Sequence, residues 1–547
     1  MRNNRAEEMN DIKQKRIIKE ESTKIKAYRL ELYETIKKRK DASINMLDAL
    51  ASNRTAKSVV ELSTSGYFER EHTSIWRALS EGWGTITEET LAQIICKQTK
   101  EEEKKQTIVI VDSTPNPRRY SKTLEDKTVV YTANPGPGNR PIAYGHIYSI
   151  VAILPQDRQD KSHWLIPVSA RRIRSDQKSN EVGISQALDF KKWCVPEQQM
   201  IIIADSLYGT ENCRQQIQKD KNIILICRMN LSRNVFFAAT KVEKLGRTKI
   251  YGHKMTLKNK ESHQPPSQVV YLTRTSARGI EFNVRLTVWD KVLVRGSRKF
   301  SAARDPFTLI QVENYHNKND KSGRPIFISI FGTLRHTITP ENIFDNYCKR
   351  FDIEHLFRFQ KTKLMLTSYQ TCITAHEEAW WKLSIATVAQ LYLARNLIMA
   401  TPQRWERHLL VYKKNTNIGN CLPPAAVQVG FSTLRDEIGS PAQPCKSRGI
   451  PPGRAAGELK KRAYSPVIIK SKFACIKMTP LQMLDKTLKI IYTGSEKLAH
   501  CSDLQIKILQ LKKSARQSLG SHALSFDDMM ELVLPIMLQK ISLPFIE

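Results

Sequence analysis

The sequence predicts an α/β fold: a mixed sheet with flanking helices, interrupted by a β-rich insertion and bordered by helical N- and C-terminal regions. Short β-rich runs first lie close together and then alternate with helical segments between residues 107 and 227. Residues 236–324 return to a purely β pattern, and apolar residues recur at helical spacing near both ends of the chain.

The composition favours a polyanionic partner. The chain has 547 residues, of which 41% are hydrophobic, so it can bury cores, and 87 Lys and Arg against 54 Asp and Glu give a net charge of +33. Nucleic acid is the first candidate partner, and a membrane surface is the alternative. The longest apolar stretch, near residues 383–394, is too short to span a bilayer.

The cysteines argue against two classes of small domain. Ten cysteines are scattered along the chain without a single C-x-x-C pair. This usage is not that of a zinc ribbon or of a secreted disulfide scaffold, and it indicates a reducing compartment. We therefore expect a cytoplasmic protein. We also expect no membrane partner and no small-molecule cofactor.

Residues 1–100 form the predicted helical N-terminal region. In residues 1–45, Ile25, Tyr28, Leu32 and Ile36 have helical spacing within a highly charged stretch, which we interpret as a solvated amphipathic helix. Residues 54–80 suggest two short helices around a Gly turn. This pattern is found in DNA-reading helix-turn-helix motifs and also in ordinary small helical domains, and it makes this region a candidate for binding DNA ends.

The predicted core comprises residues 101–235 and 325–400, and residues 236–324 form the predicted insertion. We expect core strands at the ranges 107–111, 128–132, 145–154, 164–169, 200–204, 223–227 and 326–331, with helices near 181–193 and 211–218 and long helices from 340 to 400. In the insertion, residues 282–289 alternate between apolar and polar side chains, and the second face presents Arg285 and Trp289.

Residues 401–547 form the C-terminal region. Its segment 446–472 is rich in Gly, Pro and basic residues, with eight cations against one Glu, and we interpret it as a flexible linker that follows a phosphate backbone. Its predicted DNA contacts include Arg448, Arg454, Lys460, Lys461 and Arg462. Residues 504–511 and 529–541 are predicted helices.

Two aspartates follow apolar strands. Asp112 comes after residues 108–111 and is expected to end that strand, because Ser113, Thr114 and Pro115 follow it. Asp205 follows residues 201–204 in the same manner. An aspartate at such a position can cap the next turn or serve a functional site, and two of them in one sheet favour a metal pair.

A third acid lies in a predicted continuous helix, residues 341–361. At 100° per residue, Tyr347, Arg350, Arg358 and Lys361 all fall within about 40° of Glu354. Phe344, Phe351 and Phe359 fall on a separate face that can dock on the sheet. Surface ion pairs would explain some of this stripe, but one acid among four cations or phenols is better suited to a metal ligand flanked by phosphate-binding groups.

These residues resemble a known family. Tyr347-x2-Arg350-x3-Glu354-x6-Lys361 reproduces the Y-x2-R-x3-E-x6-K motif of bacterial insertion-sequence DDE transposases, the cut-and-paste group with a β-rich insertion before the glutamate. Val111-Asp112-Ser113-Thr114 and Ala204-Asp205-Ser206-Leu207-Tyr208-Gly209 are similar to the segments around the first two acids. Gly145-His146-Ile147-Tyr148 and Trp164-x2-Pro167 also look similar. The likeness covers about residues 100–400.

The resemblance implies an RNase H-like core in which Asp112, Asp205 and Glu354 bind two Mg²⁺ ions, for which Mn²⁺ can substitute. Carboxylates are the ligands that such hard cations prefer, and two ions can support in-line displacement at phosphorus. The implied reaction cleaves the ends of a mobile element and joins the 3′-OH ends to target DNA. The implied partner is therefore double-stranded DNA, held by a homodimer in the bacterial nucleoid.

Further DNA contacts follow by analogy. Tyr347, Arg350, Arg358 and Lys361 would hold phosphates near the cut. Arg228 and Asn230, just past the strand at 223–227, are additional candidates. Trp289 is a candidate for stacking on a flipped base, with a core position as its alternative.

Two other functions stay open at this point. One is a structure-selective, metal-dependent DNA nuclease on the same fold, which cleaves without strand transfer. The other is a non-catalytic DNA-binding protein derived from a transposase, although all three acids are present.

Overall fold

The computed structural model describes residues 2–99, 106–132, 141–155, 162–239, 249–275, 280–296, 305–315, 324–398 and 422–445. These residues belong to one compact unit, Met1–Ser447. The basic linker 446–472 and the predicted helices 504–511 and 529–541 lie outside the described residues.

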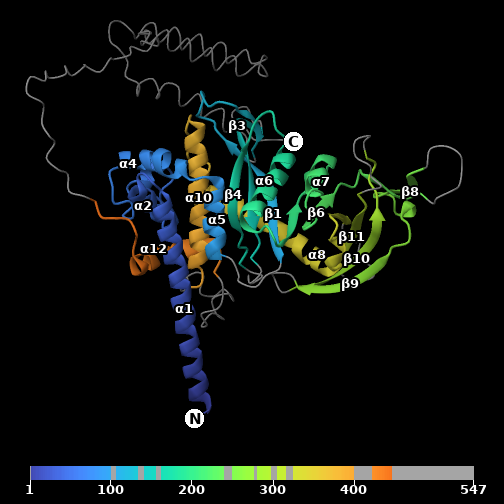
Figure 1. The fold of residues 1–547 in the computed structure, drawn as a ribbon, viewed down its shortest axis with the longest axis horizontal. Helices are drawn as coiled ribbons and strands as arrows, with labels where there is room; N and C mark the ends of the chain where they lie inside the picture. The colour runs from blue at the N-terminus through green and yellow to red at the C-terminus, as the bar shows by residue number, and fades with distance from the viewer. Residues whose placement is uncertain are drawn as a thin grey trace, which may run out of the picture. The chain divides into compact units, whose positions relative to one another are not determined.

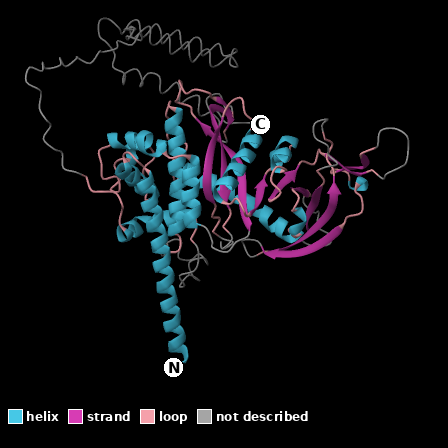
Figure 2. Cartoon of the chain, viewed as in Figure 1, coloured by secondary structure: helices cyan, strands magenta, loops and turns pink. Residues whose placement is uncertain are grey.

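A ten-stranded mixed sheet forms the centre of this unit (Figures 1 and 2). Its order is β2-β3-β1-β5-β6-β12-β11-β10-β9, and β4 pairs with β3 outside this path. β1, β5 and β6 run parallel, and the other neighbours are antiparallel. The strands are β1 (Gln106–Pro117), β2 (Thr128–Tyr131), β3 (Ile142–Ile153), β4 (Ile166–Ile173), β5 (Gln199–Ala204), β6 (Ile223–Met229), β9 (Gln268–Thr275), β10 (Glu281–Val292), β11 (Phe307–Tyr315) and β12 (Ile326–Phe331).

Helices cover both faces of the β1–β3 part of the sheet. α6 (Ser179–Cys194) lies on the face to which Val111 points, and Gly183 permits this approach because a Cβ there would come within 3.0 Å of Tyr208 and Val111. α10 (Thr374–Ala394) lies on the other face, where Trp381 stacks on Tyr148 with 4.2 Å between ring centroids. Alternating side chains of a strand point to opposite faces, so the two helices sandwich the sheet.

The remaining helices lie before, between and after these two in the chain. The N-terminal region contains α1 (Arg2–Thr35), α2 (Lys40–Ala51), α3 (Val59–Leu62), α4 (Thr73–Arg77) and α5 (Glu88–Thr99), with a π-helical turn at Ala78–Gly82. The other helices are α7 (Glu211–Ile217), α8 (Pro340–Cys348), α9 (Asp352–Thr362) and α12 (Pro424–Ile438).

The prediction of a solvated helix over residues 1–45 is wrong for the second half of α1. Ile25, Tyr28 and Leu32 are fully buried, and the Tyr28 hydroxyl donates a hydrogen bond to the Ala386 carbonyl of α10 at 2.9 Å. The apolar stripe therefore packs on α10. The sequence did not reveal this burial, because the charged residues on either side of the apolar stripe are also typical of a solvent-exposed helix.

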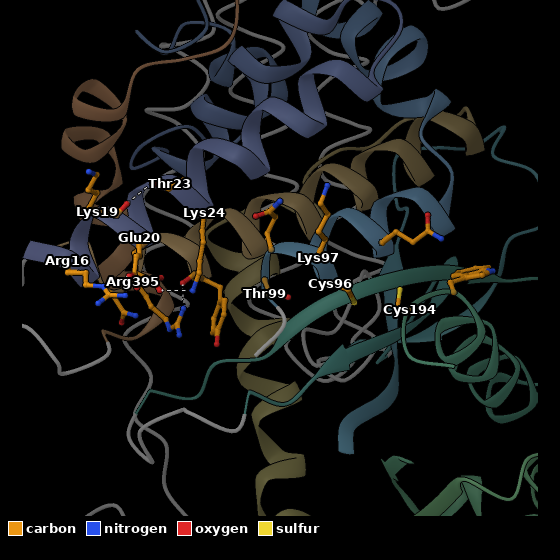
Figure 3. A pocket seen from close by; sticks show the side chains of 16 residues that line it. Arg16, Lys19, Glu20, Thr23, Lys24, Cys96, Lys97, Thr99, Cys194 and Arg395 are labelled. Carbon is orange, nitrogen blue, oxygen red and sulfur yellow. Dashed lines mark hydrogen bonds and ion pairs between the residues drawn. The ribbon is translucent and has the colours of Figure 1, made fainter. Parts of the chain in front are cut away.

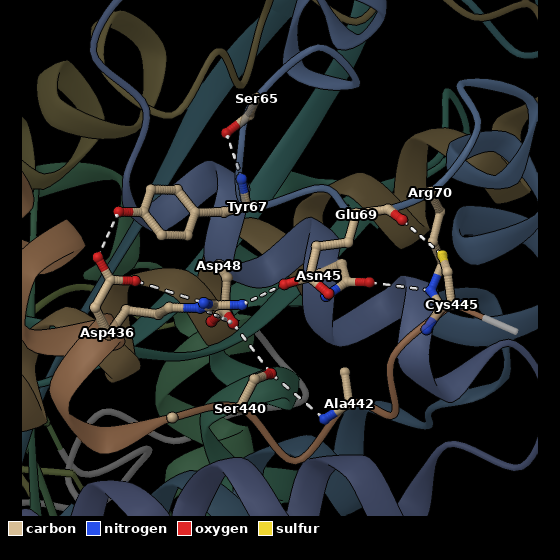
Figure 4. Close-up of polar contacts among 12 residues, drawn as sticks. Asn45, Asp48, Ser65, Tyr67, Glu69, Arg70, Asp436, Ser440, Ala442 and Cys445 are labelled. Atoms are coloured by element: carbon tan, nitrogen blue, oxygen red, sulfur yellow. Dashed lines mark hydrogen bonds and ion pairs between the residues drawn. The ribbon is translucent and has the colours of Figure 1, made fainter.

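A buried ion pair joins the N-terminal helices to α12. Arg29 of α1 pairs with Asp48 of α2, and both side chains are almost completely buried. Arg435 of α12 also approaches Asp48, at 3.4 Å. Figure 4 shows the surrounding contacts, in which Ser440 hydrogen-bonds to Asp48. These contacts anchor α12, far along the chain, to the N-terminal region.

The segment 236–324 extends the main sheet through three of its strands. β9, β10 and β11 continue the sheet beyond β12, and β12 itself pairs with β6. The remaining strands of the segment, β7 (Asn234–Ala238) and β8 (Tyr251–Thr256), form a separate two-stranded ribbon.

Candidate active site

The two strand-following aspartates lie opposite each other on neighbouring parallel strands. β1 pairs with β5 in a register that ends at Ile110 opposite Ile203, and two further positions bring Asp112 opposite Asp205. Neighbouring strands are about 4.8 Å apart, so the two carboxylates share one edge region of the sheet. The sequence predicted a metal pair because each aspartate follows an apolar strand of the same sheet.

β1 does not end at Asp112, however. It continues to Pro117, paired with β3 down to Gly145. Pro115 is tolerated within the strand, opposite Ile147, so the predicted break is wrong. Asp112 therefore sits within a paired strand, and its backbone is held on one side by β3. Asp205 does end its strand and caps the following turn by accepting a hydrogen bond from the Leu207 N–H at 2.7 Å.

The third acid is carried by a helix that is not continuous. Residues Lys349–Phe351 form a 3₁₀ turn between α8 and α9, so the angular stripe predicted over 341–361 is broken. One consequence is that Phe351 is exposed, contrary to the predicted apolar face, whereas Phe344 and Phe359 are buried as expected. Glu354 lies in the first turn of α9, with an exposed side chain.

The positive groups of the stripe nevertheless reach β1. The Arg350 guanidinium lies 3.7 Å from the Asp112 carboxylate, and both side chains are about one-fifth exposed. The Lys361 ammonium donates a hydrogen bond to the Thr114 hydroxyl at 2.6 Å. Burial raises the pKa of the Tyr347 phenol, and the charge of Arg350 acts in the opposite direction. These groups surround Asp112 from one side of the sheet.

The charges of the other two acids act on Asp112. Burial raises the pKa of Asp112 to about 6, and the charges of Asp205 and Glu354 add to this rise. The Ser113 N–H and Arg350 act in the opposite direction. Burial also lowers the pKa of Lys361. The site is thus a set of acids whose mutual repulsion a cation would relieve.

The donor set suits hard divalent cations. One oxygen of Asp112 accepts the Ser113 N–H at 2.8 Å, and one oxygen of Asp205 accepts the Leu207 N–H, which leaves the second oxygen of each carboxylate for a ligand. Within the described ranges, no group of three or more His, Cys, Asp and Glu side chains is gathered closely enough to hold a metal ion. A cation would therefore have to draw the acids together and displace Arg350 from Asp112.

Two of the predicted DNA contacts are changed by the structure. Trp289 is buried, and its indole N–H donates to the Gln264 carbonyl at 2.7 Å, so it takes the core position that was the alternative to stacking on a base. His263 and Gln264, which precede β9, cover Trp289, and the alternation pattern could not reveal this contact. The side-chain oxygen of Asn230 caps a turn by accepting the Ser232 N–H at 3.0 Å. Arg228 and Arg358 are exposed, and the charge of Arg228 reaches Tyr347.

A buried polar cluster beside the site was missed by the sequence analysis. Glu377 of α10 pairs with Arg118 at 3.1 Å and with His146 at 3.0 Å, and it accepts a hydrogen bond from Asn116 at 2.6 Å. Asn116 lies two positions beyond Thr114 on the same face of β1. The sequence contained one signal for this cluster, the polar residues at alternate positions after Asp112. Such alternation indicates a shared face only if the strand continues past Asp112, and the sequence analysis predicted that it ends there.

A second helix-lined feature lies away from these residues. A pocket of about 1330 Å³ is bordered by α1, the ends of α5 and α6, and the end of α10 (Figure 3). Several of its cations are already paired, such as Arg16 with Glu20 and Lys24 with Glu21. It contains none of the predicted site residues.

The comparison with known families agrees with this geometry. Residues 31–287 match the family model described as DDE superfamily endonuclease. This match supports a DDE-type enzyme. The matched region includes Asp112 and Asp205 and ends within β10, before Glu354. Among curated proteins, none matches the sequence.

The prediction of an RNase H-like fold is confirmed: a mixed sheet carries helices on both faces, with parallel strands at its centre. The family supports a metal-dependent endonuclease that acts on DNA. In the part of the chain that the structure describes, no helix combines the length and apolarity that crossing a membrane requires.

The raised pKa of Asp112 predicts a pH dependence. Below about pH 6 the carboxyl is protonated and cannot ligate a cation, so Mg²⁺ affinity should rise about tenfold per pH unit up to pH 6 and then level off. The folded protein also takes up this proton more readily than the unfolded chain, so the metal-free protein loses stability as pH rises from about 4 to 6. Titration of Mg²⁺ binding and denaturation between pH 4 and 8 measures both, and Asp112→Asn should flatten both profiles.

The cations near Asp112 can be tested against a neighbour. Arg350→Ala and Lys361→Ala should each lower DNA cleavage at least about tenfold while changing the melting temperature little, because the loss is of phosphate contacts. Lys349 is the matched control, because it is adjacent to Arg350 in the 3₁₀ turn. Its side chain lines a pocket with Gln106 and Gln199, at the ends of β1 and β5 that are far from the acids. Equal cleavage rates for the three variants would contradict the role of Arg350 and Lys361.

Proposed function

We propose that this chain is a DNA transposase of the insertion-sequence type. It binds the ends of a mobile element, cleaves them with two divalent metal ions and joins the 3′-OH ends to target DNA. The observation that carries the proposal is the convergence of Arg350 on Asp112 and of Lys361 on Thr114, from a helix segment that also carries Glu354. A nuclease that releases its product has less need of such a set of phosphate-binding groups.

Asp112, Asp205 and Glu354 are the residues that would hold two Mg²⁺ ions, with Mn²⁺ as a substitute. Ions at such a site supply charge neutralisation and an activated oxygen nucleophile for displacement at phosphorus. The carboxylates of Asp112 and Asp205 are oriented by the N–H groups of Ser113 and Leu207. Arg350 is placed to exchange the Asp112 carboxylate for a DNA phosphate, because its 3.7 Å contact with Asp112 is a loose one.

Lys361 would hold a second phosphate. Its ammonium is largely buried against β1 and has one hydrogen bond, to Thr114, so it retains donors for a phosphate oxygen. Tyr347 lies close enough to Arg350 for the guanidinium charge to act on its phenol, and it would hold a phosphate together with Arg350. Arg228 and Arg358, both exposed, extend the positive surface around these groups.

The proposed partner is double-stranded DNA, both as element end and as target. The net charge of +33 supports it, because neutralising phosphates releases counterions. The cations Arg448, Arg454, Lys460, Lys461 and Arg462 are proposed to contact DNA as well. We further propose that a homodimer holds the two ends of the element, since each cut end needs its own set of acids.

The test uses a DNA end that has already been cut. The full-length protein is incubated with Mg²⁺, a pre-cut end carrying a free 3′-OH, and a supercoiled plasmid. Covalent joining of the end to the plasmid is the expected result, and Asp112→Asn is the negative control. An uncut end is incubated in parallel, and its cleavage without any joining of the pre-cut end would indicate the nuclease alternative. Binding with neither reaction would indicate a non-catalytic DNA-binding protein.

A further inference from the structure

Four large apolar side chains are exposed together on β2 and β3. Val129 lies opposite Tyr144, and Tyr131 lies opposite Ile142. Tyr131 is 76% exposed and Tyr144 63% exposed, and Val129 and Ile142 are exposed as well. The two tyrosines are diagonal neighbours, within reach of one another across the strands. We name these four residues the β2–β3 strip.

The strip continues the sheet face on which the acids lie. Asp112, Thr114 and Asn116 alternate along that face of β1, opposite Ile150, Tyr148 and His146 of β3. α10 covers His146 through Glu377 and Tyr148 through Trp381. Tyr144 is the next residue of β3 on this face, and it is exposed because it lies beyond the first turn of α10.

The separation between the strip and the acids corresponds to a short stretch of DNA. The Arg118 N–H donates to the Tyr144 carbonyl at 2.8 Å, so Tyr144 is level with a position six residues beyond Asp112. At about 3.3 Å per strand residue, this is roughly 20 Å along β1. A DNA strand that passes beside α10, which covers His146 and Tyr148, would span this separation with several nucleotides.

The charge beside the strip is positive. The connection from β1 to β2 exposes Arg119 and Lys122 next to Tyr120, which is itself 82% exposed. Glu125 is the exposed acid of this connection, and the neighbouring Asp126 is already paired with Arg172. Cations interleaved with exposed aromatic rings match the alternation of phosphates and bases in a nucleic acid strand.

We propose that the β2–β3 strip binds single-stranded DNA, with bases stacking on Tyr131 and Tyr144 and phosphates contacting Arg119 and Lys122. Stacking requires exposed base faces, which paired bases inside a duplex do not offer, so a separated strand is the form of DNA that this surface recognises. The inference rests on the proposed function in taking DNA as the ligand. It adds a place for an unpaired strand about 20 Å from the acids.

The test measures binding without metal and without cleavage. A fluorescent oligo(dT) and a duplex of the same length are titrated onto the full-length protein at a salt concentration that weakens phosphate contacts. The double variant Tyr131→Ala/Tyr144→Ala should bind the single strand at least about tenfold more weakly and the duplex almost unchanged. Tyr131→Phe/Tyr144→Phe, which keeps both rings, should restore binding. Tyr271→Ala is the control, since Tyr271 is a 64% exposed tyrosine on β9.

Three results would overturn the inference. One is an unchanged affinity of the double alanine variant for oligo(dT), and another is an equal loss in the Tyr271→Ala control. The third is a dimer in the wild type that the double alanine variant loses while its DNA affinity stays the same, because this would assign the strip to a second copy paired through edge strand β2. If the wild-type protein binds oligo(dT) through the strip but does not join DNA ends, the proposed transposase function is contradicted and the inference about the strip stands.

Discussion

Asp112→Asn, Asp205→Asn and Glu354→Gln are each expected to reduce metal-dependent DNA cleavage by more than about a hundredfold. Mutating a group that only orients a metal ligand lowers metal affinity or activity about 10- to 100-fold, and removing the charge of the ligand itself should lower activity further. The neutral amides keep the shape of each side chain but do not bind Mg²⁺ as carboxylates do. Cleavage of a labelled DNA end in Mg²⁺ and in Mn²⁺ measures the effect.

The same variants should bind DNA almost as tightly as the wild type, because affinity comes mainly from Lys and Arg contacts. Asp176→Asn is the matched control, since Asp176 is exposed and pairs only with nearby Arg174. A variant that cleaves at the wild-type rate would remove its residue from the active site. A parallel loss of DNA binding would mean that the acid supports the fold rather than the reaction.

Glu377→Ala is expected to destabilise the protein by about 3–5 kcal/mol. The carboxylate is completely buried between Arg118 and His146, and its removal leaves the Arg118 cation buried without its ion-pair partner. Burial would raise the pKa of Glu377, but the hydrogen bond from His146 and the charge of Arg118 together hold it below its ordinary value. Its stabilising effect is therefore present at neutral pH and lost on acidification. Urea denaturation at pH 7 measures the change.

Glu378→Ala is the control for this loss. Glu378 is the next residue of α10, but its side chain is 42% exposed and pairs with Arg172 at 3.1 Å. An exposed pair contributes only about 0–1 kcal/mol, so this variant should be nearly as stable as the wild type. Equal stability of the two variants would contradict the importance of the buried cluster that joins β1 and β3 to α10.

Several parts of the site could be predicted from the sequence alone. Asp112 and Asp205 were placed together because each follows an apolar strand, and the register of β1 and β5 brings them opposite each other. Glu354 was recognised by the spacing of Tyr347, Arg350 and Lys361 around it, a local pattern of residue types. The spacing of these residue types singles out Glu354, although the 3₁₀ turn at Lys349–Phe351 breaks the continuous helix predicted over residues 341–361.

Other features depended on contacts between distant segments, and the corresponding predictions failed. The burial of Trp289 depends on its contact with the Gln264 carbonyl, which the alternating pattern of β10 does not encode. The burial of Tyr28 depended on α10, more than 300 residues later in the chain. The strand break predicted at Pro115 failed because β3 supplies a partner along the whole of β1.

The sequence by itself determined the strongly basic character of the chain, the alternation of strands and helices, and the three acids with their surrounding cations. These are properties of residue type and short-range spacing, which physical chemistry relates directly to charge, periodicity and ligand preference. Only the tertiary structure decided that Arg350 contacts Asp112, that Lys361 reaches Thr114, and that Glu377 holds the far end of β1 against α10. Those contacts join residues separated by more than 200 positions, and their formation depends on the sheet register and on the packing of helices across it, which no local pattern specifies.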